Sequence, residues 1–162
     1  MGDWLSSLGS VVGIGVGKID ILLVKQEYAP GETVHGRLVM KVKEPIEAKR
    51  LVVLVEATEE RTRLESDGRG GRRQVTETVT VHKVERELDG KRTYGDDAFD
   101  FHLPLPGSDA KVELPSGFLG DVAKFINVVS SLQRSPLRWR VHAFLDIPWK
   151  ANLKASADIV VR

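Results

Sequence analysis

Apolar and polar residues alternate along most of the chain after Lys18, and this period of two is the strongest constraint on the fold. The alternation is clearest at 99–103, 137–145 and 153–161. Because successive side chains of a β-strand point to opposite faces, each of these segments is predicted to be a strand. The continuous apolar run at 51–55 is typical of a central strand that is covered on both faces.

The predicted strands are joined by short turn signals rather than by helices. Pro30-Gly31 and Asp89-Gly90 combine residues that favour tight turns. We expect about seven or more strands, with no regular alternation of strands and helices. The predicted fold class is therefore all-β, and the predicted architecture is an immunoglobulin-like antiparallel β-sandwich.

Two segments carry their apolar residues at helical spacing. Residues 3–12 place them on one face of a short N-terminal helix. Residues 120–132 carry a second apolar stripe, and a Ser-Pro pair that ends helices follows it. We therefore predict a short helix and a glycine-rich lead-in at 1–17, then a single β-sandwich domain at 18–162 with one inserted helix near 120–132.

Composition excludes several classes of site. The chain has no cysteine, so it has no disulfide, thiolate metal site or cysteine nucleophile. Its 24 Lys and Arg against 23 Asp and Glu leave a net charge of +1, whereas a dedicated nucleic-acid-binding domain usually has a large basic excess. No apolar run is long enough to cross a bilayer, and the start lacks the positive region of a secretory signal. We expect a cytoplasmic protein with no nucleic-acid partner and no cofactor.

The glycines at 13–17, followed by Lys18, suggest a phosphate-binding loop but fail its pattern. That loop needs Gly, four residues and then Gly-Lys-Ser/Thr, whereas Val12 and Ile19 stand at its two ends. A dinucleotide site needs a strand before its glycines and a helix after them, which is the reverse of the predicted order. We interpret the glycines as a lead-in to the first strand.

Catalytic chemistry has no positive signal beyond a metal hypothesis. The four histidines show no ligand spacing, but all fall on predicted strands and could converge in space. Asp96 and Asp97 could add oxygen ligands, although a solvated turn is the favoured interpretation of them. We predict no catalytic, cofactor-binding or metal-binding residues, and keep a metal-dependent or small-ligand enzyme as an alternative. The histidines are His35, His82, His102 and His142.

One segment and one aromatic residue are the candidate contacts with a protein partner. Residues 60–74 contain five arginines and three glycines, and they are predicted to form a long hairpin loop. This loop is either a solvated tip or a contact surface for an acidic partner. Trp149 is predicted to pack in the core or as a lid on the sandwich, with an exposed partner anchor as the alternative. The arginines are Arg61, Arg63, Arg69, Arg72 and Arg73.

Edge strands offer a physical route to association. Segments 33–43 and 75–88 alternate charged with apolar residues, and we predict that they lie at sheet edges. An edge presents unpaired backbone N–H and C=O groups, to which a partner or a second copy can add a strand. A change of phase between Val81 and Val84 also predicts a β-bulge in the second segment.

Several motifs occur in an order that is more specific than any one of them. They are G-I-G at 13–15, K-I-D at 18–20 and P-G-E-T-V-H-G at 30–36. In this order they resemble the opening of the bacterial sporulation-control proteins of the arrestin-like superfamily. The stretch F-D-F-H-L-P-L-P at 99–106 and the strand at 137–147 resemble segments of arrestin N-terminal domains in general.

The resemblance implies a sandwich that acts as an adaptor or scaffold, without catalysis. Only one arrestin-like domain fits in the chain, so a second lobe is either absent or supplied by a second subunit, and we expect a partner or a second copy. The leading hypothesis is a non-enzymatic protein–protein interaction module, compatible with a regulatory role and with self-association through sandwich edges. Besides the enzyme, the other alternative is a peripheral membrane adaptor that uses residues 1–16. No residues match the phosphate sensor of classical arrestins.

Overall fold

The computed structural model describes residues 11–12, 15–107 and 136–162. Most of the predicted N-terminal helix and all of the helix predicted at 120–132 lie outside these residues. The prediction of a helix is wrong for Val11–Val12, which form the short strand β1 antiparallel to Ala155 and Lys154. Branched valine side chains suit a strand, and pairing gives this segment backbone partners that a single helical turn would lack.

The larger sheet contains six strands in the order β1-β11-β10-β6-β7, and β3 (Glu27–Tyr28) pairs with β11 as well. All of its pairings are antiparallel except β3 with β11. The four long strands are β6 (Arg50–Ser66), β7 (Arg72–Asp89), β10 (Arg138–Asp146) and β11 (Leu153–Val161).

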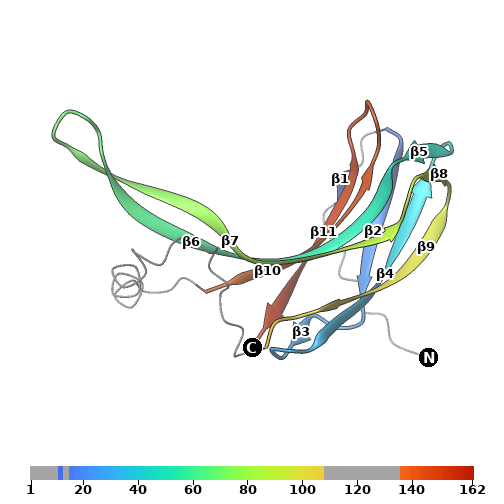
Figure 1. Cartoon of the computed structure of the whole chain (residues 1–162), viewed down its shortest axis with the longest axis horizontal. Helices are drawn as coiled ribbons and strands as arrows, with labels where there is room; N and C mark the ends of the chain where they lie inside the picture. The colour runs from blue at the N-terminus through green and yellow to red at the C-terminus, as the bar shows by residue number, and fades with distance from the viewer. Residues whose placement is uncertain (1–10, 13–14, 108–135) are drawn as a thin grey trace, which may run out of the picture.

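The second sheet has three antiparallel strands in the order β2-β4-β9. They are β2 (Gly17–Leu23), β4 (Thr33–Val42) and β9 (Asp97–Pro104). A small antiparallel pair, β5 (Ile46–Ala48) with β8 (Arg92–Tyr94), lies beside them in Figure 1. Because β4 has a neighbour on both sides, the prediction that 33–43 forms an edge is wrong. The prediction for 75–88 is confirmed within the described chain, since β7 ends the larger sheet.

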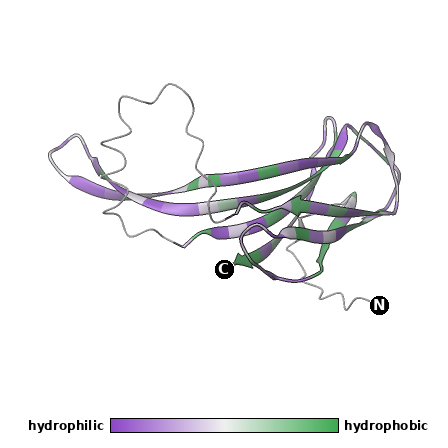
Figure 2. Ribbon diagram, turned by 60° about the horizontal axis from the view of Figure 1, so that its bottom comes forward, coloured by the Kyte–Doolittle hydropathy of each residue, from purple (hydrophilic) through white to green (hydrophobic). Residues whose placement is uncertain are grey.

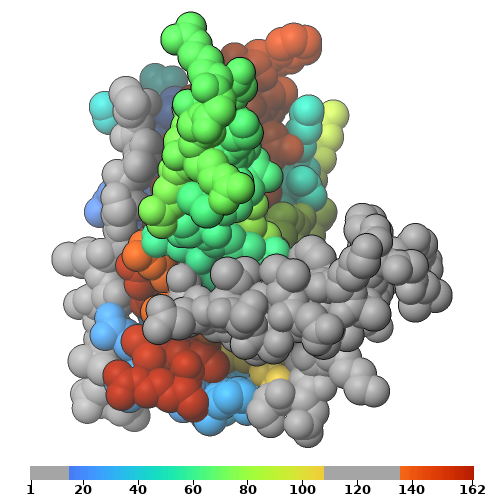
Figure 3. All heavy atoms as spheres, turned by 90° about the vertical axis from the view of Figure 1, so that its left-hand side faces the viewer, coloured from blue at the N-terminus to red at the C-terminus, as the bar shows by residue number. Residues whose placement is uncertain are grey.

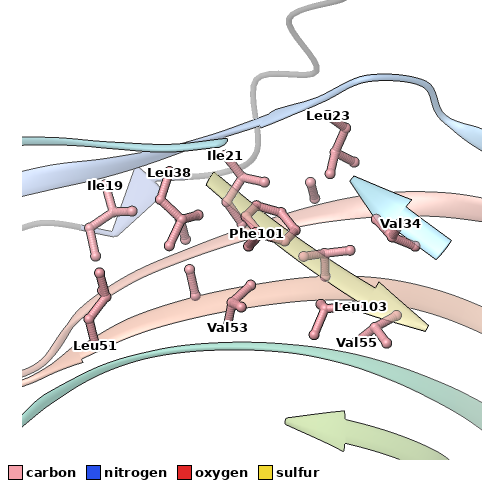
Figure 4. Close-up of a cluster of buried hydrophobic side chains, with 14 of the residues drawn as sticks. Ile19, Ile21, Leu23, Val34, Leu38, Leu51, Val53, Val55, Phe101 and Leu103 are labelled. Carbon is pink, nitrogen blue, oxygen red and sulfur yellow. The ribbon is translucent and has the colours of Figure 1, made fainter. Parts of the chain in front are cut away.

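The core lies between the two sheets. Side chains from β2, β4, β6 and β9 point toward one another in Figure 4, and apart from Tyr28, Tyr94 and Trp139 no side chain with a polar group is buried among the described residues. Burying one such aliphatic side chain contributes about 1.5–3 kcal/mol, so this layer holds the sheets together. The all-β sandwich is therefore confirmed. The labelled side chains are Ile19, Ile21, Leu23, Val34, Leu38, Leu51, Val53, Val55, Phe101 and Leu103.

Strands β6 and β7 continue well beyond the sandwich as a two-stranded hairpin (Figure 1). The prediction of a long loop at 60–74 is wrong in extent, because the strands pair up to Ser66 and Arg72 and only the five residues between them turn. Few apolar residues mark these strands, so hydropathy alone does not reveal them. The predicted bulge is confirmed at Val81, where Ala57 and Thr58 face His82 and Thr80.

Replacing Leu38 by alanine tests the importance of the core layer. Leu38 is fully buried in β4, so we expect the free energy of unfolding to fall by about 2–5 kcal/mol. The matched control is Leu64→Ala on the hairpin, where the leucine is 66% exposed and the change should stay within about 0.5 kcal/mol. Urea denaturation followed by circular dichroism measures both. Equal losses for the two variants would contradict the assignment of the core.

Candidate interaction surface

The hairpin beyond the bulge is the largest feature of the described chain that the core does not use. Nine cross-strand pairs run from Thr58 opposite Thr80 to Ser66 opposite Arg72, a length of about 30 Å. None of the residues at 58–66 and 72–80 is buried. Figure 2 shows mostly hydrophilic colours along this projection, and Figure 3 shows its atoms standing forward of the sandwich. The hairpin is therefore an exposed arm rather than a part of the fold's interior.

The alternation of side chains gives the hairpin two different faces. One face, called the charged face, combines four charged residues of β6 with two charged residues and two valines of β7. The opposite face, called the threonine face, carries five threonines, and the hydroxyls of Thr62 and Thr76 lie 3.3 Å apart. The charged face consists of Glu59, Arg61, Arg63, Glu65, Arg73, Val75, Glu77 and Val79.

Ion pairs neutralise most of the charge on the charged face. The Arg63 guanidinium lies 2.8 Å from the Glu65 carboxylate and 4.0 Å from that of Glu77. Arg73 lies 3.7 Å from Glu65 across the strands, and Arg61 bonds to Glu59 beside it. Such exposed pairs contribute little stability each. They do fix where positive and negative groups stand along the face.

The turn that joins the strands is organised by Asp67. One carboxylate oxygen of Asp67 accepts hydrogen bonds from the backbone N–H groups of Arg69 and Gly71, each at 2.9 Å. Gly68 and Gly70 adopt positive φ values of 73° and 83°, which glycine reaches without steric cost. The turn at the tip therefore has a defined conformation, which the Asp67 side chain stabilises.

The structure brings only some of the predicted arginines together. Arg61, Arg63 and Arg73 share the charged face, whereas Arg72 lies on the threonine face and Arg69 lies in the turn. Within the described residues, the side chains of Arg69 and Arg72 have no ion-pair partner. The five predicted arginines thus lie on one hairpin, but in three different environments.

The sequence prediction names the arginines but not the glutamates that face them, although the position of the turn is enough to find these glutamates. Folding the segment about Gly68 and Gly70 places Glu65 opposite Arg73 and Arg61 opposite Glu77. A hairpin drawn in that register would have revealed the opposite charges facing each other. Counting arginines in a loop could not reveal them, because a loop has no register.

Trp149 lies at the other end of the molecule. Trp149 comes three residues after Asp146, the last residue of β10. Asp146 pairs with Arg50, the first residue of β6, whereas the hairpin tip follows the last residue of β6. Trp149 is therefore about 50 Å from the tip, measured along β6. Its side chain is fully exposed and its φ is 63°, so the interpretation as a core or lid residue is wrong. A bulky side chain in the left-handed region is strained, since its Cβ crowds the backbone.

The four histidines do not converge. His35 and His102 face each other across β4 and β9, with ring centroids 6.2 Å apart, and Arg86 bonds to His102. His142 lies on β10 of the larger sheet, at 2.8 Å from Glu56. His82 packs against Trp139, and burial lowers its pKa. No group of three metal-ligating side chains occurs among the residues that the structure describes.

The predicted aspartates also have structural roles. A hydrogen bond from the Arg92 guanidinium, 3.0 Å from Asp97, lowers the pKa of that carboxyl. Asp96 accepts a hydrogen bond of 2.8 Å from the backbone N–H of Val42. These contacts tie the β8–β9 connection to the sandwich, so the aspartates serve as structural anchors there.

The comparisons with known proteins identify the family of this fold. The family model described as "Arrestin (or S-antigen), N-terminal domain" matches residues 18–162. The chain therefore belongs to the arrestin N-terminal domain family, which confirms the resemblance noted in the sequence. The comparison with curated proteins finds no match.

A solved structure of the same kind is Spo0M, the sporulation control protein from Bacillus subtilis, with a TM-score of 0.57. The alignment has 20% identity and covers 92% of this chain, and it shows a shared fold. It covers 50% of the Spo0M chain, so this chain spans about half the length of that protein. No helix within the described residues is long and apolar enough to cross a membrane.

Substituting Trp149 by glycine separates a strained turn from a packed lid. Glycine adopts the positive φ freely and no packing is lost, so we expect the free energy of unfolding to stay constant or rise by up to about 1 kcal/mol. Chemical denaturation measures this change. A loss of about 3–5 kcal/mol, as expected for a buried tryptophan, would contradict the exposed position.

Removing the Asp67 carboxylate tests whether this side chain stabilises the turn. In Asp67→Ala the N–H groups of Arg69 and Gly71 lose their acceptor, so their amide hydrogens should exchange at least about 5-fold faster. The global free energy of unfolding should change by less than about 1 kcal/mol, since the tip is exposed. Hydrogen exchange followed by NMR reports both residues. Unchanged exchange would show that the turn does not depend on Asp67.

Proposed function

We propose that this chain is a non-enzymatic, regulatory interaction module, and that its β6–β7 hairpin contacts a protein partner. The observation that carries the proposal is the nine-pair arm, which projects from the sandwich and buries nothing in the core. The membership of the chain in the arrestin N-terminal domain family supports a binding role. The fold that it shares with Spo0M, which is named as a sporulation control protein, supports a regulatory role.

The energetics of the arm favour a role in binding. Ordering the backbone of each residue costs about 1–2 kcal/mol, and an isolated two-stranded hairpin is marginally stable in water. Here the base of the arm is held by the sandwich, but the nine outer pairs gain no core burial in return. An arm of this kind gains its largest stabilising contacts when another surface covers it.

The charge of the arm limits the kind of surface that it fits. Between residues 58 and 80 five arginines are balanced by five carboxylates, so the arm as a whole is not basic. The fitting partner surface therefore carries both signs in a matching pattern. The carboxylates are Glu59, Glu60, Glu65, Asp67 and Glu77.

A shortened arm tests this function. The variant replaces residues 61–77 by Asn-Gly, which joins Glu60 to Thr78 through a tight hairpin turn. Because the removed residues lie outside the core, the circular dichroism spectrum should keep its β-sheet shape and the melting temperature should be preserved. Partners cross-linked in extracts of the source cell are identified, purified and titrated against both chains. We expect the affinity of the shortened chain to fall at least about 10-fold.

The Trp149→Gly chain is the control, because it alters an exposed residue at the opposite end. It should bind the purified partner as tightly as the unaltered chain. Equal binding by the shortened and unaltered chains would contradict a contact through the arm. Loss of binding by the Trp149 variant alone would place the contact at the β10–β11 turn instead.

A further inference from the structure

Along the arm, β7 has an outer edge on the side turned away from β6. β6 lies on one side of β7, and no described strand lies on the other. Every second backbone N–H and C=O of residues 72–80 therefore points away from the hairpin and can pair with an added strand. These nine residues are long enough to pair with an added strand, and none of their side chains is buried.

The bulge at Val81 limits how far an added strand can run. Thr80 and His82 face the neighbouring residues Thr58 and Ala57, so one extra residue is inserted in β7 between them. Beyond such an insertion the outward-pointing N–H groups change from one set of alternate residues to the other. A straight strand can therefore pair with 72–80 but not across Val81. Any partner strand must be short and must match the charges within this segment.

We propose that the strand added to β7 is the β7 of a second copy of this chain, antiparallel and centred on Val75. This inference rests on the proposed function, because it names the partner of the same arm. Two copies related by a two-fold axis then form one four-stranded sheet, in the order β6-β7-β7-β6. In this register Val75 faces the partner's Val75, Arg73 faces the partner's Glu77, and Glu77 faces the partner's Arg73.

The charge pattern selects this register among its neighbours. Centred on Gln74 or Thr76, Arg73 faces a valine, and centred on Glu77 two like charges face each other. Opposite charges directly across a strand pair are attractive and like charges are repulsive. Centred on Val75, a full row of the four-stranded sheet alternates in sign. It runs from Glu65 to Arg73, then to the partner's Glu77 and the partner's Arg61.

The edge of β6 on the arm is the competing route. Centred on Leu64, a β6–β6 pairing also matches charges, because Arg63 faces the partner's Glu65. That pairing spans only 62–66 before it reaches the turn at Asp67, whereas the β7 pairing spans 72–78. Arg138 also reaches that side of β6, where it lies 3.4 Å from Glu60. The longer edge of β7, beside which no described strand lies, is therefore favoured.

Sedimentation velocity of the full 162-residue chain over a range of concentrations tests the inference. The unaltered chain should show a concentration-dependent dimer. Arg73→Glu and Glu77→Arg should each weaken the dimer at least about 10-fold, because each turns two attractive pairs into two repulsive ones. An equimolar mixture of the two variants should recover the dimer, since the new carboxylate at position 73 faces the new guanidinium at position 77.

The matched control is Arg69→Glu, which makes the same change of charge in the turn, outside the paired segment. It should dimerise like the unaltered chain. The melting temperature of each variant shows that it folds, and recovery in the mixture requires two folded chains. A second readout is amide exchange, in which alternate residues of 72–78 should become protected as the protein concentration rises.

A monomer at all concentrations overturns the inference, and so does a dimer that tolerates both substitutions, which would lie along another edge such as β6. These outcomes differ from failure of the proposed function. If the chain is monomeric but the shortened arm loses a foreign partner, only self-pairing fails. If β7 pairing is demonstrated while the shortened chain binds the foreign partner unchanged, the contact of that partner through the arm fails.

Discussion

The pairing of β6 with β10 on one side and β7 on the other is the interaction on which the rest of the structure depends. The first half of β6 pairs with β10 from Arg50 to Thr58 and contributes four buried residues to the core. Its second half has only β7 beside it among the described strands. One continuous strand thus belongs to the sandwich at one end and to the exposed arm at the other, so the core fixes the base of the arm.

The sandwich could be predicted because its strands leave a strong trace in the sequence. Buried positions in β10 and β11 recur at every second residue, and the apolar run in β6 marks a strand covered on both faces. The arm leaves no such trace, since its pairing depends on backbone hydrogen bonds and on threonine and ion pairs. Size and hydrophobicity likewise mislead for Trp149, because its side chain is fully exposed in a turn where its φ is 63°.

The candidate surface could be predicted only in part, because the sequence shows which residues it contains but not how they pair across the hairpin. The arginines were visible as a cluster, but their division between two faces and a turn requires the register of the hairpin. Once the register is known, Glu65 and Glu77 become as informative as Arg73. The surface is then an ordered pattern of both signs, which explains why a chain with a net charge of +1 can still present a specific charged arm.

The local cancellation of charge on the arm has a consequence for the speed of binding. A pattern of alternating signs has a field that fades within a few ångströms, whereas a patch of one sign reaches to about the Debye length of 8 Å in physiological salt. The arm therefore gives little long-range steering, and its association rate constant should be near the unsteered range of about 10⁵–10⁶ M⁻¹s⁻¹. Discrimination between partners then arises after contact, through how long a matched pair of surfaces stays together.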